Sequence, residues 1–276
     1  MMIATLLAVM LSANDPIQAL VTAARDALVK AGFERKTDDA GSVWFTGGSG
    51  ESTVVLLHGA NDQAGTWAAV APALSKQQRL IMPDLAGHGE SEPRTGDIPL
   101  SLVVKRLHGI LEREGTGRVT LVGNSMGGWV AMLYAFEHPD RVERLVLENA
   151  SGMAWNLTGV PLFPKNREEM RAAMRAVNGP DDKTPDAILD ALVAKKDQPM
   201  GRVREIFESL VDTRLEKLDM PVTLIWGRHD GLLSIDYAKA LQARIKGSKL
   251  VIIEDAGHIP HRQQPQKFIE CLKATF

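Results

Sequence analysis

The stretch RVTLVGNSMGG, residues 118–128, decides the fold. Residues 118–122 are rich in β-branched and apolar side chains, as expected of a buried strand, and residues 127–137 have the pattern of a helix. Between them, Ser125 lies in a tight turn whose glycines lack a Cβ and let neighbouring backbone approach. This strand–turn–helix setting is that of a nucleophile elbow, which exposes the serine above the N-terminus of the helix. The alternative is a glycine-rich turn in which the serine is incidental.

Apolar strands and helical segments alternate on both sides of this stretch. Strands are predicted at 53–57, 80–82, 118–122, 142–147, 222–226 and 249–253, and helices at 67–74, 100–114, 127–137, 235–245 and 265–275. Near-continuous Val, Ile and Leu strands separated by helices indicate an α/β protein with a mostly parallel sheet, covered by helices on both faces. Ligands of such sheets bind beyond the carboxyl ends of the strands, so the residues that directly follow strands are the functional candidates.

The chain before and between these strands has two further features. Asp15-Pro16 predicts the start of a helix that ends at Gly32, and two short strands are expected around Asp38 to Gly41, with residues 43–45 in the second. A long interruption then separates the strands at 142–147 and 222–226.

This interruption, residues 150–218, is expected to be helical. It opens with a Gly- and Pro-rich apolar segment, continues with helical stretches at 167–177, 185–195 and 202–215, and contains nothing typical of a parallel strand. A helical insertion after a strand end, above the sheet, is typical of a lid. The alternative is that the insertion has no functional role. We therefore expect an apolar N-terminal segment and helix at 1–32, an α/β core at 33–149 and 219–276, and a helical cap at 150–218.

Composition excludes several classes of protein. With 276 residues, 45% hydrophobic and 24% charged, the chain is an ordinary globular protein and not a disordered chain, a collagen or a coiled-coil rod. The 32 basic and 34 acidic residues give a net charge of -2, which provides no electrostatic basis for binding nucleic acid. The single cysteine, Cys271, excludes an intramolecular disulfide, and the histidines lack a metal-binding spacing. We expect neither a cofactor nor a metal.

The first 13 residues, MMIATLLAVMLSA, leave two interpretations open. They are apolar but too short to span a bilayer, and their length is that of a signal-peptide core. The first basic residue is Arg25, however, and Leu11 is a poor residue two positions before a cleavage site. The segment is therefore either a docked N-terminal helix of a cytoplasmic protein, or a signal peptide or membrane anchor. In the second case the protein is exported, or contacts a membrane or lipid peripherally through this segment.

A serine hydroxyl needs a base with a pKa near neutral pH. His258 follows the last strand and is preceded by a flexible glycine, so we predict that it activates Ser125. His261 lies three residues further on, beyond a proline, and is the alternative base.

The imidazole in turn needs a carboxylate that fixes its tautomer. Asp230 follows the strand that ends at residue 226 and is the predicted acid, while Glu148, after an earlier strand, is the alternative. The chain order Ser125, Asp230, His258 is the order expected of this architecture.

Two backbone amides are predicted to stabilise an oxyanion. Met126 follows the serine, and Ala60 lies in the loop 58–61 after the first parallel strand. His58 is expected to organise that loop, and His88 to shape the loop after another strand. In the interruption, Trp155, Leu162 and Phe163 are predicted to line an apolar acyl tunnel; the alternative is that they only attach the cap to the sheet.

The combination of His58-Gly59, the 84–91 loop, the Ser125 elbow, Asp230 and Gly257-His258 resembles the α/β-hydrolase superfamily, from about Thr53 to the C-terminus. The resemblance implies the α/β-hydrolase fold, with the cap inserted after the sixth strand. Residues 123–128 and 161–164, with the following 168–170, look like those of monoacylglycerol lipases and related bacterial lipases, which often carry an N-terminal membrane anchor.

Other members of the superfamily match less well. The elbow also resembles that of the carbon–carbon bond hydrolases of aromatic degradation, which usually have a more glycine-rich loop than 58–61. Haloalkane dehalogenases and epoxide hydrolases carry aspartate in place of the elbow serine.

We therefore expect a serine hydrolase that acts on small carboxylic esters, with short-to-medium acyl chains or monoacylglycerols preferred, through an acyl-enzyme. The alternatives are hydrolysis of a carbon–carbon bond in a vinylogous diketone, and a ligand receptor or scaffold that kept the triad. The sequence leaves the oligomeric state open.

Overall fold

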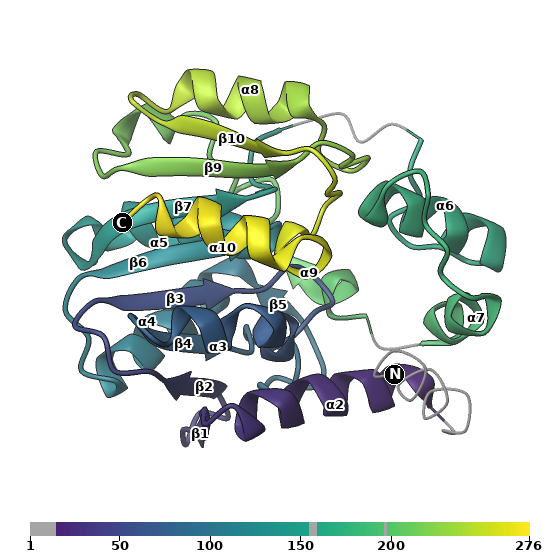
Figure 1. The fold of residues 1–276 in the computed structure, drawn as a ribbon, viewed down its shortest axis with the longest axis horizontal. Coiled ribbons are helices and arrows are strands. Elements are labelled where there is room, and N and C mark those ends of the chain that lie inside the picture. Colours follow the sequence, from purple (N-terminus) through teal and green to yellow (C-terminus); the bar gives the residue numbers. More distant parts are fainter. Residues whose placement is uncertain (1–14, 155–158, 196–197) are drawn as a thin grey trace.

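The computed structural model describes residues 15–154, 159–195 and 198–276 around one central sheet (Figure 1). The sheet has eight strands in the order β1-β2-β4-β3-β6-β7-β9-β10. They are β1 (Glu34–Thr37), β2 (Val43–Gly47), β3 (Thr53–Leu57), β4 (Arg79–Pro83), β6 (Val119–Asn124), β7 (Val142–Glu148), β9 (Val222–Gly227) and β10 (Lys249–Ile253). The first two pairings, β1 with β2 and β2 with β4, are antiparallel, and the others are parallel. The predicted mostly parallel sheet is confirmed.

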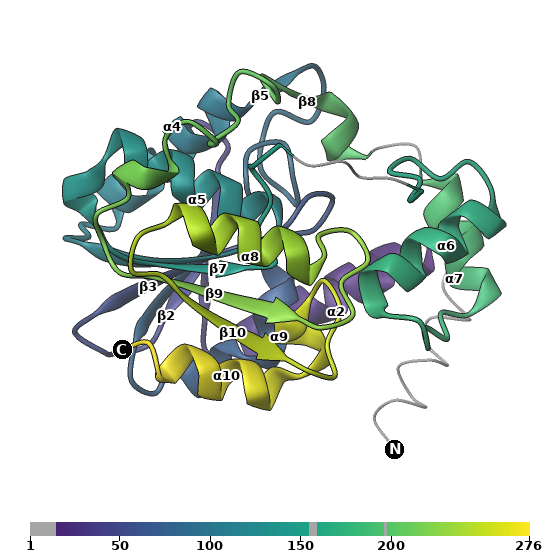
Figure 2. The same ribbon diagram turned by 90° about the horizontal axis from the view of Figure 1, so that it is seen from above.

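Helices cover both faces of this sheet, as predicted. Figure 2 shows α4, α5 and α8 on one face and α10 on the other. The helices are α2 (Pro16–Lys30), α3 (Ala71–Leu74), α4 (Leu100–Arg113), α5 (Met126–Glu137), α6 (Arg167–Asn178), α7 (Asp186–Ala194), α8 (Ile235–Arg244), α9 (Pro260–Gln263) and α10 (Pro265–Lys273), with 3-10 turns η1 (Ala64–Ala69), η2 (Pro139–Arg141), η3 (Pro199–Arg202) and η4 (Leu215–Lys217). No helix in the described part of the chain has the length and apolarity needed to cross a membrane. Residues 1–13, on which the anchor hypothesis depends, lie outside it.

Burial on both faces explains why the strands are apolar without interruption. Successive strand side chains point to opposite faces. In β3, Val55 and Leu57 join the core cluster under α4 and α5, while Val54 and Leu56 join the cluster under η1, α3 and α10.

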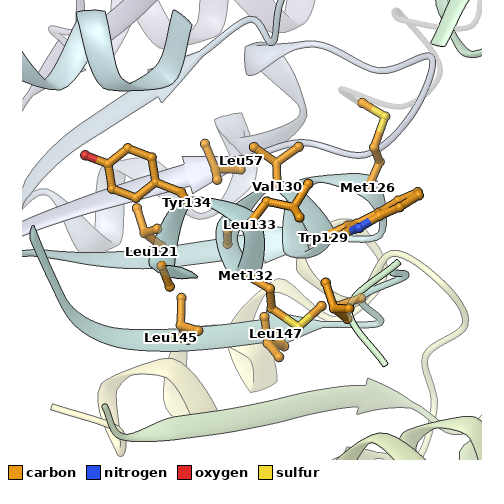
Figure 3. Packing of buried hydrophobic residues seen from close by; sticks show 14 of the residues in the cluster. Leu57, Leu121, Met126, Trp129, Val130, Met132, Leu133, Tyr134, Leu145 and Leu147 are labelled. Atoms are coloured by element: carbon orange, nitrogen blue, oxygen red, sulfur yellow. The ribbon is translucent and has the colours of Figure 1, made fainter. Parts of the chain in front are cut away.

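Helix α5 is buried almost all round because it lies across the centre of the sheet. Its side chains Trp129, Val130, Leu133 and Tyr134 lie above β3, β6 and β7 (Figure 3). A helix that is apolar on every side belongs in the core of a protein. The start of α5, directly after Ser125, is therefore held rigidly.

The insertion after β7 is less helical than predicted. Helices α6 and α7 form where expected and stand apart from the sheet, on the side to which its strands point (Figures 1 and 2). The predicted helix at 202–215 is wrong: β8 (Val203–Arg204) pairs in parallel with β5 (Ile98–Pro99), and turns and η4 follow. The expectation of no parallel strand in the insertion is wrong for the same reason. The Glu205 carboxylate accepts hydrogen bonds from Ser101 N and Oγ and ties the segment to the start of α4.

The predicted helix at 67–74 is also divided in two, η1 and α3. Pro72 stands in the first turn of α3 and has no backbone N–H to continue a preceding helix.

A buried arginine fixes the N-terminal helix to the core. Arg25 of α2 is 7% exposed, and its Nη1 donates to Asp84 Oδ2 at 2.8 Å, while the guanidinium lies 5.0 Å from the centre of the Phe45 ring. Asp84 follows β4 and also accepts hydrogen bonds from the amides of Ala64 and Glu90, each at 2.8 Å. This ion pair therefore joins α2 to the carboxyl edge of the sheet.

Replacing Arg25 by alanine should lower the free energy of unfolding by about 3–5 kcal/mol, because the Asp84 charge would remain buried without its partner. The matched control is Arg35→Ala, since Arg35 pairs with Glu90 at 2.6 Å but is 44% exposed, and its loss should cost less than about 1 kcal/mol. Urea denaturation measures both, and equal losses would contradict the structural role of Arg25.

Candidate active site

Ser125 occupies a strained turn between β6 and α5. Its φ of 52° and ψ of -119° lie in a region that side-chain-bearing residues rarely adopt. Hydrogen bonds hold it there: Ser125 N donates to Glu148 O at 3.0 Å, and Ser125 O accepts from Gly128 N at 3.0 Å and from Ser151 N at 3.1 Å. The residue as a whole is half-buried.

Three positions without a side chain allow the turn to pack closely, both within itself and against β3 and the loop that follows it. A Cβ on Gly127 would lie 2.2 Å from Leu57 O, and one on Gly59 would lie 3.2 Å from Ser125 Cβ. A Cβ on Gly123 would lie 2.4 Å from the carbonyl carbon of Gly127. The glycines predicted to permit close approach therefore do so.

His258 and Asp230 form a buried pair. His258 Nδ1 lies 2.7 Å from Asp230 Oδ2, and each residue is 6% exposed. Asp230 Oδ1 also accepts hydrogen bonds from the amides of Leu232 at 2.8 Å and Leu233 at 2.9 Å. A carboxylate beside Nδ1 favours the tautomer with the proton on that nitrogen, which leaves the Nε2 lone pair free to act as a base.

The pKa of His258 is raised above its ordinary value. Burial lowers the pKa, but the charge and hydrogen bond of Asp230, together with the charge of Glu148, outweigh it. The base must be unprotonated, so a reaction that uses it loses rate as the pH falls through this pKa.

Two asparagines that the sequence reasoning missed connect the site. Asn124, which precedes the serine, donates from Nδ2 to His258 O at 2.9 Å. Asn149 follows β7, donates from Nδ2 to Asp230 Oδ2 at 2.6 Å, and accepts from Gly227 N at 3.1 Å. Both asparagines lie at the carboxyl ends of adjacent strands, and this position could have identified them as candidates from the sequence.

Glu148 and His261, the alternative acid and the alternative base, pair with each other. His261 Nδ1 lies 2.7 Å from Glu148 Oε2, and His261 N donates to Glu148 Oε1 at 2.7 Å. The structure therefore brings together Asp230 and His258, and separately Glu148 and His261. The catalytic roles of all four remain predictions.

The loop 58–61 is organised by an internal histidine. His58 Nε2 accepts from Leu85 N at 2.9 Å, and Nδ1 lies 2.7 Å from Gly59 O, so both ring nitrogens are used in holding loops together. In the described residues the amides of Ala60 and Met126 donate to no protein acceptor, and their role toward an oxyanion stays a prediction.

His88 lies beside His58 and is unsuited to base chemistry at neutral pH. Its Nδ1 lies 3.1 Å from Ala86 O, and burial, with the neighbouring His58, lowers the pKa of His88 to about 3.

The predicted substrate-binding residues are described only in part. Leu162 and Phe163 precede α6 and are 51% and 49% exposed, while Trp155 lies outside the described residues. Within those residues, no group of three or more His, Cys, Asp or Glu side chains could hold a metal ion.

Comparison with known proteins gives consistent matches. The sequence pattern of the Alpha/beta hydrolase family matches residues 54–270. The chain is 30% identical over 260 residues to an uncharacterized protein of Mycobacterium tuberculosis (82% of this chain, 75% of the relative) and 29% identical over 260 residues to monoacylglycerol lipase abhd6-A of Xenopus laevis (82% and 77%). The structure of a bacterial membrane phospholipase A superposes with a TM-score of 0.79 at 25% identity, over 94% of this chain and 90% of that one.

Replacing Gly127 by alanine should destabilise the protein by about 1–3 kcal/mol, because the new Cβ would push the loop after β3 away from α5. Gly109 is the control, since a Cβ there meets nothing within 4 Å and it lies inside α4. Gly109→Ala should stabilise by about 0.5–1 kcal/mol. Chemical denaturation compares the two, and a neutral Gly127→Ala would contradict the close packing of the elbow.

Proposed function

We propose that this chain, which belongs to the alpha/beta hydrolase family, hydrolyses carboxylic esters through an acyl-enzyme formed on Ser125. Its relatives include a monoacylglycerol lipase, and the proposal adds the triad, the reaction and the substrate class. One observation carries it: the buried Asp230–His258 pair, joined through Asn124 to the strained serine turn.

The proposed reaction uses the site residues in two half-reactions. His258 Nε2 accepts the proton of Ser125 Oγ while the oxygen attacks the ester carbonyl. The amides of Met126 and Ala60 donate to the oxyanion of the tetrahedral intermediate. His258 then gives its proton to the departing alkoxide, which leaves as an alcohol. Water, deprotonated by His258, attacks the acyl-enzyme, and His258 then returns this proton to Ser125 Oγ as the carboxylic acid leaves.

Asp230 acts by holding the imidazole and balancing the charge that develops on it. Its carboxylate accepts hydrogen bonds from Asn149 and from the amides of Leu232 and Leu233, so it stays fixed in place when His258 gains a proton.

An acyl ester of short-to-medium chain length is the proposed substrate. Relatives named as a monoacylglycerol lipase and a membrane phospholipase A support this class. The apolar Leu162 and Phe163, on the segment before α6, are the described residues proposed to contact the acyl chain, together with Trp155.

A fluorophosphonate probe should label the protein at Ser125 alone, because no other serine is proposed to have a paired base, and a p-nitrophenyl ester should be hydrolysed. Both signals should vanish in Ser125→Ala. Ser151→Ala is the matched control, since its amide donates to Ser125 O and its side chain is half-buried, and it should retain both. Mass spectrometry locates the label.

Labelling that survives Ser125→Ala would refute the nucleophile. Labelling without turnover of any acyl ester would favour a receptor, and turnover of a vinylogous diketone alone would favour the carbon–carbon bond hydrolase.

The acyl contact predicts a dependence on chain length. Each buried methylene should contribute up to about 0.8 kcal/mol, so kcat/KM should rise with acyl length until the contact is filled and then fall. Leu162→Ala combined with Phe163→Ala should flatten this profile while acetate esters are hydrolysed almost normally. Phe207, 83% exposed, provides the control, because Phe207→Ala should leave the profile unchanged. Uniform loss of all activities with an unchanged profile would contradict the contact.

A further inference from the structure

A second acid–histidine pair lies beside the proposed triad, and the proposed reaction does not use it. Glu148 and His261 are both 0% exposed, with His261 Nδ1 2.7 Å from Glu148 Oε2. The other ring nitrogen, Nε2, lies 2.9 Å from Thr66 Oγ1, and the ring stacks on Trp67 with 3.9 Å between centroids. Burying an ionised carboxylate costs free energy, so this arrangement calls for an explanation.

Glu148 contacts both halves of the site at once. Its backbone oxygen accepts from Ser125 N at 3.0 Å, and its side chain accepts from His261 N at 2.7 Å, three residues after His258. Because Glu148 ends β7 next to Asn124 in the sheet register, it stands directly behind the serine turn.

We propose that Glu148 is a positioning residue for His258: paired with His261, it holds the 258–261 segment against the serine turn and supplies a second negative charge that stabilises the imidazolium formed in each half-reaction. The inference rests on the proposed function. It assigns Glu148 a role in support of the triad, distinct from that of the triad acid Asp230.

The charges around His258 agree with this role. From the elements packed against it, the charged groups are Asp230, on the loop after β9, and Glu148, at the end of β7. Helix α6 contributes the carbonyl of Val177, which accepts from His258 N at 2.7 Å, and β6 contributes the amide of Asn124. Both carboxylates raise the pKa of His258 against the lowering effect of burial.

The proposed role requires a neutral His261, so that the Glu148–His261 pair keeps a net negative charge. Thr66 Oγ1 lies 2.9 Å from His261 Nε2, and in the described part of the chain this hydroxyl makes no other hydrogen bond. A hydroxyl that donates to Nε2 requires that nitrogen to be unprotonated. The single ring proton is then on Nδ1 and faces the Glu148 carboxylate.

Glu148→Gln removes the charge and can keep the contacts. The glutamine oxygen can accept from His261 N, and its NH2 can donate to Nδ1 once the ring proton moves to Nε2, where Thr66 oxygen accepts it. The pKa of His258, measured by NMR titration of 15N-histidine-labelled protein without substrate, should fall by roughly 0.5–1 unit. The acidic limb of kcat/KM for a p-nitrophenyl ester should move to lower pH by the same amount.

Two controls bracket this result. Glu143→Gln removes an exposed carboxylate of the same strand and should leave the pKa of His258 unchanged. Asp230→Asn should lower kcat by about 10⁴, because it enforces the wrong tautomer, whereas Glu148→Gln should lower plateau kcat by less than about tenfold.

An unchanged pKa of His258 in Glu148→Gln would overturn the inference, as would a loss of kcat equal to that of Asp230→Asn. If Glu148→Gln does not fold, the 15N chemical shifts of the His261 ring nitrogens in the wild-type protein provide the test. A neutral His261 protonated on Nδ1 supports the inference, and an imidazolium at pH 7 overturns it. The NMR titration needs no substrate. If the protein has no esterase activity, the proposed function is refuted, but the effect of the Glu148 charge on the pKa of His258 can still be measured.

Discussion

The close approach of backbone around Ser125 is the constraint on which the rest of the structure depends. The serine can adopt its strained φ only because α5 is buried across the sheet and because Gly59, Gly123 and Gly127 leave room for carbonyl groups and the neighbouring loop. Strain of this kind persists where surrounding packing over-determines it. The sheet therefore serves the candidate site directly, since it supplies the rigid support that keeps Ser125, the proposed nucleophile, in an unfavourable backbone conformation.

Buried polar side chains at the ends of adjacent strands connect this turn to the other loops. Asn124, Glu148 and Asn149 each form hydrogen bonds to a different segment, namely the His258 loop, the start of α9 and the Asp230 loop. Inside a protein such bonds are strong when every partner is present and costly when one is missing. The three loops are thus linked as one network, which explains how residues far apart in sequence keep a common geometry.

Helix α6 of the proposed cap is part of the same network. The last turn of α6 presents its carbonyl groups to the two loops of the proposed triad: Ala176 O accepts from Gly231 N at 2.8 Å, and Val177 O accepts from His258 N at 2.7 Å. Helix C-termini have carbonyl groups without intrahelical partners, and here the loops that carry Asp230 and His258 supply donors for two of them. This end of the cap is consequently tied to the site.

The sequence by itself determined the parallel sheet, the serine turn, and the candidates Asp230 and His258, because strand periodicity and turn glycines are local signals and the carboxyl ends of parallel strands meet at one edge. It left Glu148 and His261 as alternatives, since residue order cannot say which acid faces which imidazole. Only the tertiary structure decided those pairings, together with the buried Arg25–Asp84 pair and the extended β8 in place of a helix. The physical reason is that each depends on contacts between segments distant in the chain, where burial and hydrogen-bond partners outweigh local propensity.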